Sequence, residues 1–171
     1  MRIVSLSLFA CALLFNLTSE GQSQPRLHLK LKNSDVNEVF FSPDGRYLAT
    51  ASDNHTTTIW NLQKGRMERM LEGHTHEVSV LSWSPNGSRL VTGSRDKTAI
   101  VWDVKTGKKL VTLKGKHTAF IYGIGFSPDG KRITTGADDS TAVIWNAKTG
   151  EPLHTLKGHS SSIYDLAYTR D

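Results

Sequence analysis

Short runs of alternating or β-branched residues, separated by polar turns, predict β-strands along much of this chain. In Val78–Trp83, apolar and polar residues partly alternate, which is typical of a strand with one buried face. Arg89–Ser94 follows a Pro-Asn-Gly turn, the β-branched run Thr98–Trp102 comes next, and Lys109–Leu113 supplies a fourth strand. Gly107, in the Lys-Thr-Gly turn before that strand, suits a positive φ. This stretch therefore predicts four short strands without helical periodicity.

The same arrangement recurs with a period of 42 to 43 residues. An aromatic-Ser-Pro-Asp/Asn-Gly turn begins at Phe41, Trp83 and Phe126. A tryptophan repeats at the same offsets, at Trp60, Trp102 and Trp145. A Leu-Glu/Lys-Gly-His element appears as Leu71–His74, as Leu113–His117 with one extra residue, and as Leu156–His159. Three independent markers that keep one period indicate an internal repeat.

These signatures resemble WD40 repeats, which run about 40–45 residues each. Trp102-Asp103 keeps the family's Trp-Asp dipeptide, whereas Trp60 and Trp145 are each followed by Asn. The resemblance covers the chain from Leu27 to Asp171. It implies an all-β fold made of WD40-type β-propeller blades, each of four antiparallel strands.

The repeat divides the chain into units at about 32–73, 74–116 and 117–158, with a partial unit at 159–171. We also expect a strand near Leu27–Leu31 before the first unit and one near Ile163–Tyr168 after the last. About three and a half blades are therefore present, fewer than the four to eight of closed propellers. The prediction is an incomplete ring or a fragment, with open blade edges that favour self-association.

The resemblance further implies a buried hydrogen-bonded chain of His, Ser/Thr, Asp and Trp in each blade. The second unit supplies His74, Thr92, Asp96 and Trp102, and the third supplies His117, Thr135, Asp139 and Trp145. The first unit has Lys32 and Asn54 at the His and Asp positions, beside Thr50 and Trp60, which predicts a weaker network. Recurrence argues against a catalytic triad, because an enzyme needs one such site whereas a repeat needs one per blade. The alternative of a propeller hydrolase would require a single non-repeating polar cluster, and the sequence shows none.

Partner binding is implied on the face formed by the loops that lead into the first strand and join the second to the third. The positions there that differ between units are Asp35, Glu77, Phe120 and Ser162; Asn37, Ser79, Tyr122 and Tyr164; and Asp53, Arg95 and Asp138. Arg95, Phe120, Tyr122 and Tyr164 belong to the types enriched at binding hot spots, and we predict that they contact a protein or peptide partner. The alternative is that the aromatic residues only pack between adjacent blades.

Composition narrows the function further. The chain has 37% hydrophobic and 22% charged residues and a net charge of +5, which permits an acidic partner without requiring one. Basic residues cluster near the opposite turns, for example Arg46, Arg89 and Lys131. We interpret them as solvated turn residues; the alternative is a basic rim that attracts an anionic polymer or a lipid surface. No aromatics are interleaved to stack bases, so nucleic acid is not expected as a partner. The one cysteine, Cys11, excludes an internal disulfide and a cysteine zinc site. No nucleotide, haem or metal motif is present, and we expect no cofactor and no enzyme activity.

Residues 1–21 resemble a signal peptide rather than part of the fold. Arg2 precedes the apolar run Ile3–Phe15, whose 13 residues fall short of the roughly 20 that span a bilayer. Ser19-Glu20-Gly21 suits cleavage after Gly21, and residues 22–26 form a linker. The alternative is an uncleaved membrane anchor. We therefore predict a secreted or periplasmic, non-catalytic scaffold that has no membrane span once the signal is removed. The alternative is that the chain is the N-terminal part of a longer WD40 protein whose activity lies in further sequence.

Overall fold

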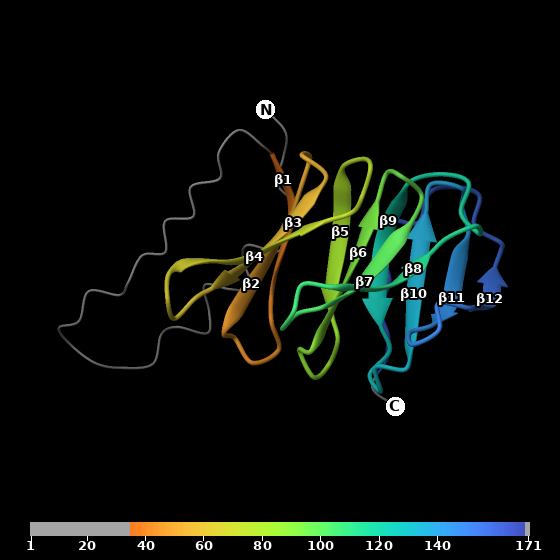
Figure 1. Cartoon of the computed structure of the whole chain (residues 1–171). Coiled ribbons are helices and arrows are strands. Elements are labelled where there is room, and N and C mark those ends of the chain that lie inside the picture. Colours follow the sequence, from red (N-terminus) through yellow and green to blue (C-terminus); the bar gives the residue numbers. More distant parts are fainter. Residues whose placement is uncertain (1–34, 170–171) are drawn as a thin grey trace, which may run out of the picture. The chain divides into compact units, whose positions relative to one another are not determined.

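Residues 35–169 are described by the computed structural model, and within them the chain forms twelve β-strands and no helix. The strands make three four-stranded antiparallel sheets with neighbours in chain order (Figure 1). Blade 1 comprises β1 (Val36–Phe41), β2 (Tyr47–Ser52), β3 (Thr56–Asn61) and β4 (Arg66–Glu72). Blade 2 comprises β5 (Val78–Trp83), β6 (Arg89–Ser94), β7 (Ala99–Asp103) and β8 (Lys109–Leu113). Blade 3 comprises β9 (Ile121–Phe126), β10 (Arg132–Ala137), β11 (Ala142–Asn146) and β12 (Pro152–Leu156). The predicted all-β class and four-stranded blade are confirmed.

The three blades pack side by side through their faces. The first strands β1, β5 and β9 are neighbours in space, and each pair of adjacent blades encloses one apolar cluster. Middle strands such as β6 are buried along almost their whole length because sheets cover both of their faces. The outer strand β12 is exposed throughout. Burial therefore follows the order of strands within a blade rather than simple alternation along each strand.

The hairpin between the first and second strand of every blade is built by the same four residues. In blade 1 the buried Ser42 donates its hydroxyl to Asp44 (2.6 Å) and accepts from the Tyr47 amide (2.9 Å). Gly45 has a φ of 68°, a left-handed conformation that glycine adopts without steric cost. The same geometry recurs at Gly87 and Gly130, which explains why the Ser-Pro-Asp/Asn-Gly motif repeats.

Glycine also permits a close approach between blades 2 and 3. A Cβ built on Gly93 of β6 would lie 2.7 Å from a methyl carbon of Ile121, the first residue of β9. Gly136 of β10 has the same relation to Ile163, at 2.5 Å. Each of these isoleucines fills the space that a side chain on the preceding blade would otherwise need.

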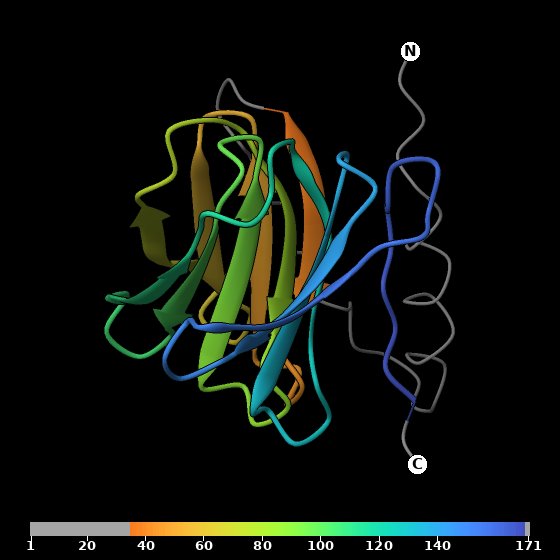
Figure 2. The same cartoon turned by 90° about the vertical axis from the view of Figure 1, so that its right-hand side faces the viewer.

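The chain after β12 departs from the prediction. A strand was expected over Ile163–Tyr168, and this expectation is wrong: the segment crosses one face of blade 3 as coil (Figure 2). Among the described residues, one backbone hydrogen bond connects this segment to blade 3: the Ile163 N–H donates to the Ala137 carbonyl (3.1 Å). Because no adjacent strand is present in residues 35–169 to pair with it, no ladder forms. The expected strand at Leu27–Leu31 and the signal segment at residues 1–21 lie outside the described residues.

No helix in the part of the chain that the structure describes is long and apolar enough to cross a membrane.

Candidate functional site

Two loops meet at the same edge of each blade and position the variable side chains. In blade 2 the Arg95 amide, after β6, donates to the carbonyl of Glu77, just before β5 (3.0 Å). In blade 3 the Asp138 amide makes the equivalent bond to Phe120 (2.9 Å). Such a bond fixes the loop after the second strand against the loop before the first. The predicted binding positions therefore come together at one edge by backbone geometry.

Arg95, Phe120, Tyr122 and Tyr164, predicted as partner-binding residues, form a continuous row of side chains. The Arg95 guanidinium pairs with Glu77 (2.8 Å) and lies 5.6 Å from the centre of the Phe120 ring. Phe120 meets Tyr122 edge to face, with ring centres 6.3 Å apart. Tyr122 lies 5.3 Å from Tyr164 at an interplanar angle of 31°. We call these four residues the cation–aromatic row; it runs from blade 2 across blade 3 to the segment after β12.

Both alternatives considered for the aromatic residues find support in the geometry of the row. Phe120 and Tyr122 are half-buried, and each contacts a side chain of a neighbouring unit, Arg95 and Tyr164 respectively, as packing between blades requires. Tyr164 is 67% exposed, although it contacts Tyr122 on one side. Cation–π and aromatic pairs of this kind contribute roughly 0.5–1.5 kcal/mol each, which favours this arrangement of the row.

Several neighbouring variable positions are used within the molecule instead. The Asn37 amide donates to Asp53 (2.6 Å) and to the Val78 carbonyl of blade 2 (2.9 Å). The Ser79 hydroxyl donates to the Ile121 carbonyl of blade 3 (2.5 Å). Ser162 donates to Asp138. These short polar side chains link successive units. The large side chains at this edge are those of the cation–aromatic row.

The buried network predicted for blades 2 and 3 has the following geometry. In blade 2 the Trp102 indole N–H donates to the Thr92 hydroxyl (2.9 Å), which is 2.8 Å from His74 Nε2. His74 Nδ1 is 2.8 Å from an Asp96 oxygen, and because a carboxylate only accepts, Nδ1 carries the proton. The Thr92 hydroxyl therefore donates to Nε2, and every polar side-chain group of this network has a hydrogen-bond partner.

Blade 3 repeats these contacts with a looser last step. Trp145 donates to Thr135 (2.8 Å), and Thr135 is 2.7 Å from His117 Nε2. His117 Nδ1 is 3.2 Å and 3.3 Å from the two Asp139 oxygens. In blade 1, Trp60 still donates to Thr50 (3.2 Å), but the exposed Asn54 bonds only to Thr56 among the described residues. Lys32 lies outside the described residues.

Electrostatics agree with an ionised Asp96 and Asp139 and with a neutral His117 in these networks. Burial alone would raise the pKa of Asp96, but hydrogen bonds from His74 and Thr98 outweigh it and hold this pKa well below its ordinary value. Burial lowers the pKa of His117, against the opposing attraction of Asp139. The Thr92 and Thr135 hydroxyls, which a triad would use as nucleophiles, are fully buried and already bonded to an indole. A substrate cannot reach them, so the networks serve the fold.

Two charged residues have roles that the sequence did not indicate. Glu38 of β1 accepts a bond from the Leu81 amide of blade 2 (2.6 Å). Burial raises its pKa to about 7, with the Leu81 bond opposing and the Asp165 charge adding to the shift. The only available signal was an acid at a position where the other complete units have Val80 and Gly123.

Arg89 belongs to the basic turns of the opposite edge but is not simply solvated. Its guanidinium donates to the carbonyls of Gly130 (2.7 Å) and Ala147 (3.2 Å) in blade 3. It also lies 5.2 Å from the centre of the Phe126 ring. Arg89 therefore joins blade 2 to blade 3. Within residues 35–169, no group of three or more His, Cys, Asp and Glu side chains is arranged to hold a metal ion.

Comparison with known proteins places these features in a family. The family description "WD domain, G-beta repeat" matches residues 23–61, 65–103, 107–146 and 150–171. The chain is 39% identical over 64 residues to coatomer subunit beta'-1 of Arabidopsis thaliana, an alignment that covers 36% of this chain and 7% of that protein. It is 37% identical over 51 residues to target of rapamycin complex subunit LST8-1 of the same plant, covering 30% of this chain and 17% of that protein.

Solved structures show the same architecture. A chain in a crystal structure of the mitotic checkpoint complex superposes with a TM-score of 0.77 and 27% identity, over 84% of this chain and 44% of that one. The RRP9 WD40 repeats superpose with a TM-score of 0.76 at 21% identity, over 80% of this chain and 43% of that one, which shows the fold alone. Three repeated four-stranded blades define a β-propeller repeat protein. The chain belongs to the WD40 repeat family, and it spans less than half of the solved chains and less than a fifth of the curated relatives that it matches.

Proposed function

We propose that this WD40 protein is an exported, non-catalytic binding module that engages another protein or peptide through the cation–aromatic row. The observation that carries the proposal is the row itself: four large side chains from three successive units, in contact with one another and exposed at Tyr164. Arg and Tyr are enriched at binding hot spots, and Tyr buries a large area at low conformational cost. The curated relatives are by name subunits of complexes, which supports a role in assembly.

A partner on this edge would gain a preformed surface rather than a flexible one. Glu77 neutralises Arg95 and holds its guanidinium against Phe120, so the side chain loses little further freedom on binding. Tyr164 offers both a ring face and a hydroxyl. The surface therefore suits an extended peptide or loop with an apolar side chain and polar backbone groups.

The test is a site-specific photocrosslinker placed at Tyr164, with Leu110 as the matched control position. Leu110 is another large apolar residue of the surface, 53% exposed on the outer strand β8 and away from the row. A partner crosslinked from Tyr164 is then produced in pure form and its affinity measured by titration calorimetry. Arg95→Ala and Tyr164→Ala each weaken binding about tenfold or more, the effect of losing about 1.4 kcal/mol. Leu110→Ala leaves the affinity unchanged.

Equal crosslinking at both positions, or an affinity that does not respond to Arg95→Ala and Tyr164→Ala, would remove the row as the binding surface. Export is tested separately by expressing the full chain and determining the N-terminal residue of the released protein. Cleavage after Gly21 supports a secreted or periplasmic protein, whereas a membrane-bound product that retains Met1 supports the anchor.

The second candidate is that this chain is the front part of a longer WD40 protein whose activity lies in further sequence. The share of the solved chains that it spans, 43–44%, favours this alternative. An antibody against the described blades distinguishes the two by the mass of the native protein in its source cell.

A further inference from the structure

The contact between blades is a repeated interface with two different faces. Blade 1 contributes Ala49, Ile59 and Leu71 to the first apolar cluster, and blade 2 contributes Leu81 and Trp83. We call the first kind of surface the receiving face and the second the inserting face. Each blade has one of each, because alternate residues of its strands point to opposite sides.

The second junction repeats the first position by position. The receiving face of blade 2 contains Val91, Val101 and Leu113, and the inserting face of blade 3 contains Ile124 and Phe126. By register these are the equivalents of Ala49, Ile59, Leu71, Leu81 and Trp83 in the first junction. All are buried in both junctions. The structure thus contains two junctions in which a receiving face packs against an inserting face.

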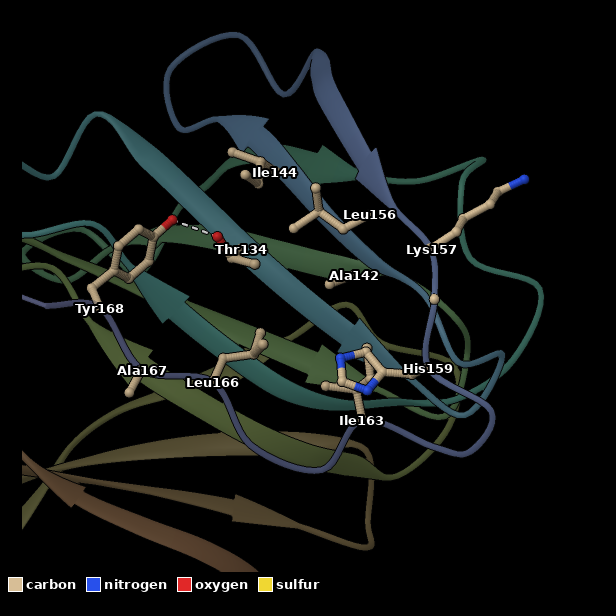
Figure 3. A pocket seen from close by; sticks show the side chains of 11 residues that line it. Thr134, Ala142, Ile144, Leu156, Lys157, His159, Ile163, Leu166, Ala167 and Tyr168 are labelled. Atoms are coloured by element: carbon tan, nitrogen blue, oxygen red, sulfur yellow. Dashed lines mark hydrogen bonds between the residues drawn. The ribbon is translucent and has the colours of Figure 1, made fainter.

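A third receiving face is open, on blade 3. Its equivalents of Ala49, Ile59 and Leu71 are Thr134, Ile144 and Leu156, and these residues line an apolar cavity of about 420 Å³ (Figure 3). Leu156 is 50% exposed, whereas Leu71 and Leu113 at the same position in the other blades are 2% and 1% exposed. This face is apolar like the other two receiving faces, but it is only partly buried.

A matching inserting face is open on blade 1. Val39 and Phe41 are 41% and 46% exposed, whereas their equivalents in blades 2 and 3 are buried. At the Phe41 position, Trp83 and Phe126 are each 8% exposed. Removing large apolar side chains from water is favourable, so these two exposed residues supply a driving force for association that the single chain does not use.

The part of the cavity nearest the inner strands is covered by the coil after β12. Leu166 and Tyr168 stand at the positions that Ile124 and Phe126 occupy in the second junction, and Tyr168 bonds to the Thr134 hydroxyl (Figure 3). The coil lacks a partner strand among the described residues, so it forms no ladder there. A complete blade with the same kind of side chains, hydrogen-bonded as a sheet, fills both this place and the empty cavity beside it.

We propose that two copies of this chain associate head to tail, with the inserting face of blade 1 of each copy seated on the receiving face of blade 3 of the other. The incoming β1 displaces residues 164–169, puts Val39 and Phe41 where Leu166 and Tyr168 now lie, and separates Tyr164 from Tyr122, so this association and partner binding through the complete cation–aromatic row exclude each other. Two such junctions close a symmetric pair of chains into a ring of six blades, within the four to eight of known propellers. Both faces are on the same molecule, and their equivalents on the other blades fit each other twice within it, which favours a second copy over an unrelated partner.

The experiment compares the native mass of the full chain, by light scattering after size-exclusion chromatography, with its denatured mass. The expected ratio is two for the wild-type chain. Phe41→Asp and Leu156→Asp each give a ratio of one, because every junction in a dimer of either variant contains a buried carboxylate. Both residues are exposed in the single chain, so both variants fold. Leu110→Asp, at an exposed apolar residue outside either face, keeps the ratio at two.

Mixing the two variants provides a test that a merely unfolded variant cannot pass. An equimolar mixture of Phe41→Asp and Leu156→Asp retains one unaltered junction, and differently tagged copies co-elute as a one-to-one pair. Hydrogen exchange gives a second readout: amides of residues 164–169 exchange faster in the dimer than in the monomeric variants.

A wild-type ratio of one, dimers of either single variant, or a mixture that stays monomeric would each overturn the proposal. Slower exchange of residues 164–169 in the dimer would overturn it as well, since the coil would then remain in place between the copies. Failure of the dimer leaves Tyr164 in the cation–aromatic row and the partner-binding test unaffected, so the two failures are distinguishable.

Discussion

Asp96 is the polar residue whose replacement tests the blade 2 network most directly. One of its oxygens accepts from His74 Nδ1 (2.8 Å) and the Thr75 amide (3.0 Å). The other accepts from the Thr98 amide (2.9 Å) and the Thr98 hydroxyl (2.6 Å). Asp96→Asn has the same shape but only one accepting oxygen. Its NH₂ group must face one of these two pairs of donors.

The expected cost follows from those contacts. Two donors lose a charged acceptor, and bonds to charged groups contribute about 1.5–3 kcal/mol each, so Asp96→Asn should lower the free energy of unfolding by about 3 kcal/mol. That is a large share of the roughly 5–15 kcal/mol that stabilises a typical domain. Blade 1 supplies a matched control, because Asn54 already occupies the equivalent position and is exposed. Asn54→Asp should change the free energy of unfolding by less than about 0.5 kcal/mol.

Urea unfolding at pH 7, followed by tryptophan fluorescence, measures both variants. The pKa of Asp96 is depressed from 3.8, so its contribution is present above pH 3.8 and is lost as the pH falls towards the folded-state value. The difference between wild type and Asp96→Asn should therefore shrink in acid below about pH 4. A loss at pH 7 below about 1 kcal/mol, or an equal loss for Asn54→Asp, would refute the assignment of the network as a major stabilising element.

Three further predictions concern the junctions between blades. The pKa of Glu38 is raised from 4.5 to about 7, so its ionisation lowers the free energy of unfolding as the pH rises through this window. Glu38→Gln should therefore be more stable than wild type by up to about 3 kcal/mol at pH 8 and nearly equal to it at pH 4. Urea unfolding at both pH values measures the difference. Gly93→Ala should cost about 1–3 kcal/mol because the new methyl group overlaps the Cγ2 methyl of Ile121 and the Cγ1 methyl of Val80, and Val80→Ala, which removes the second of these, should recover part of the loss in a double-mutant cycle. Arg89→Lys should lower the stability by about 1–2 kcal/mol in thermal unfolding, because an ammonium group cannot make both hydrogen bonds and also keep the contact with Phe126. A change within experimental error would show that Arg89 is a solvated turn residue that does not join the blades.

The repeated part of the fold was predictable because each unit places the same positions in the same surroundings. The strands expected at Val78–Trp83, Arg89–Ser94 and Lys109–Leu113 have those bounds in the structure, and the expected Thr98–Trp102 is displaced by one residue. The resemblance to WD40 repeats supplied the network residues, and the hydrogen bonds among them lie within single blades. Periodicity carries this information without any knowledge of tertiary contacts.

Features that occur once, or that depend on a neighbouring blade, were not predictable in this way. Glu38 reads as a surface residue until the Leu81 amide of the next blade is placed beside it. Arg89 reads as a solvated turn residue until two carbonyls, 41 and 58 residues further along the chain, are brought to its guanidinium. The expected strand at Ile163–Tyr168 failed for a related reason: sequence similarity gives a segment its side chains, but a strand also needs a hydrogen-bonding neighbour. The contacts of Arg95 with Phe120 likewise required the angle between blades.

The cation–aromatic row crosses two boundaries between units, and this position has a thermodynamic consequence. A ligand that touches Arg95, Tyr122 and Tyr164 together binds only the arrangement in which the three units are docked. By mass action, free ligand at 100 times its dissociation constant adds about 2.7 kcal/mol to that docked state. Occupancy of the edge would therefore raise the melting temperature of the whole array. A thermal-shift screen can thus find ligands of this surface before their chemistry is known.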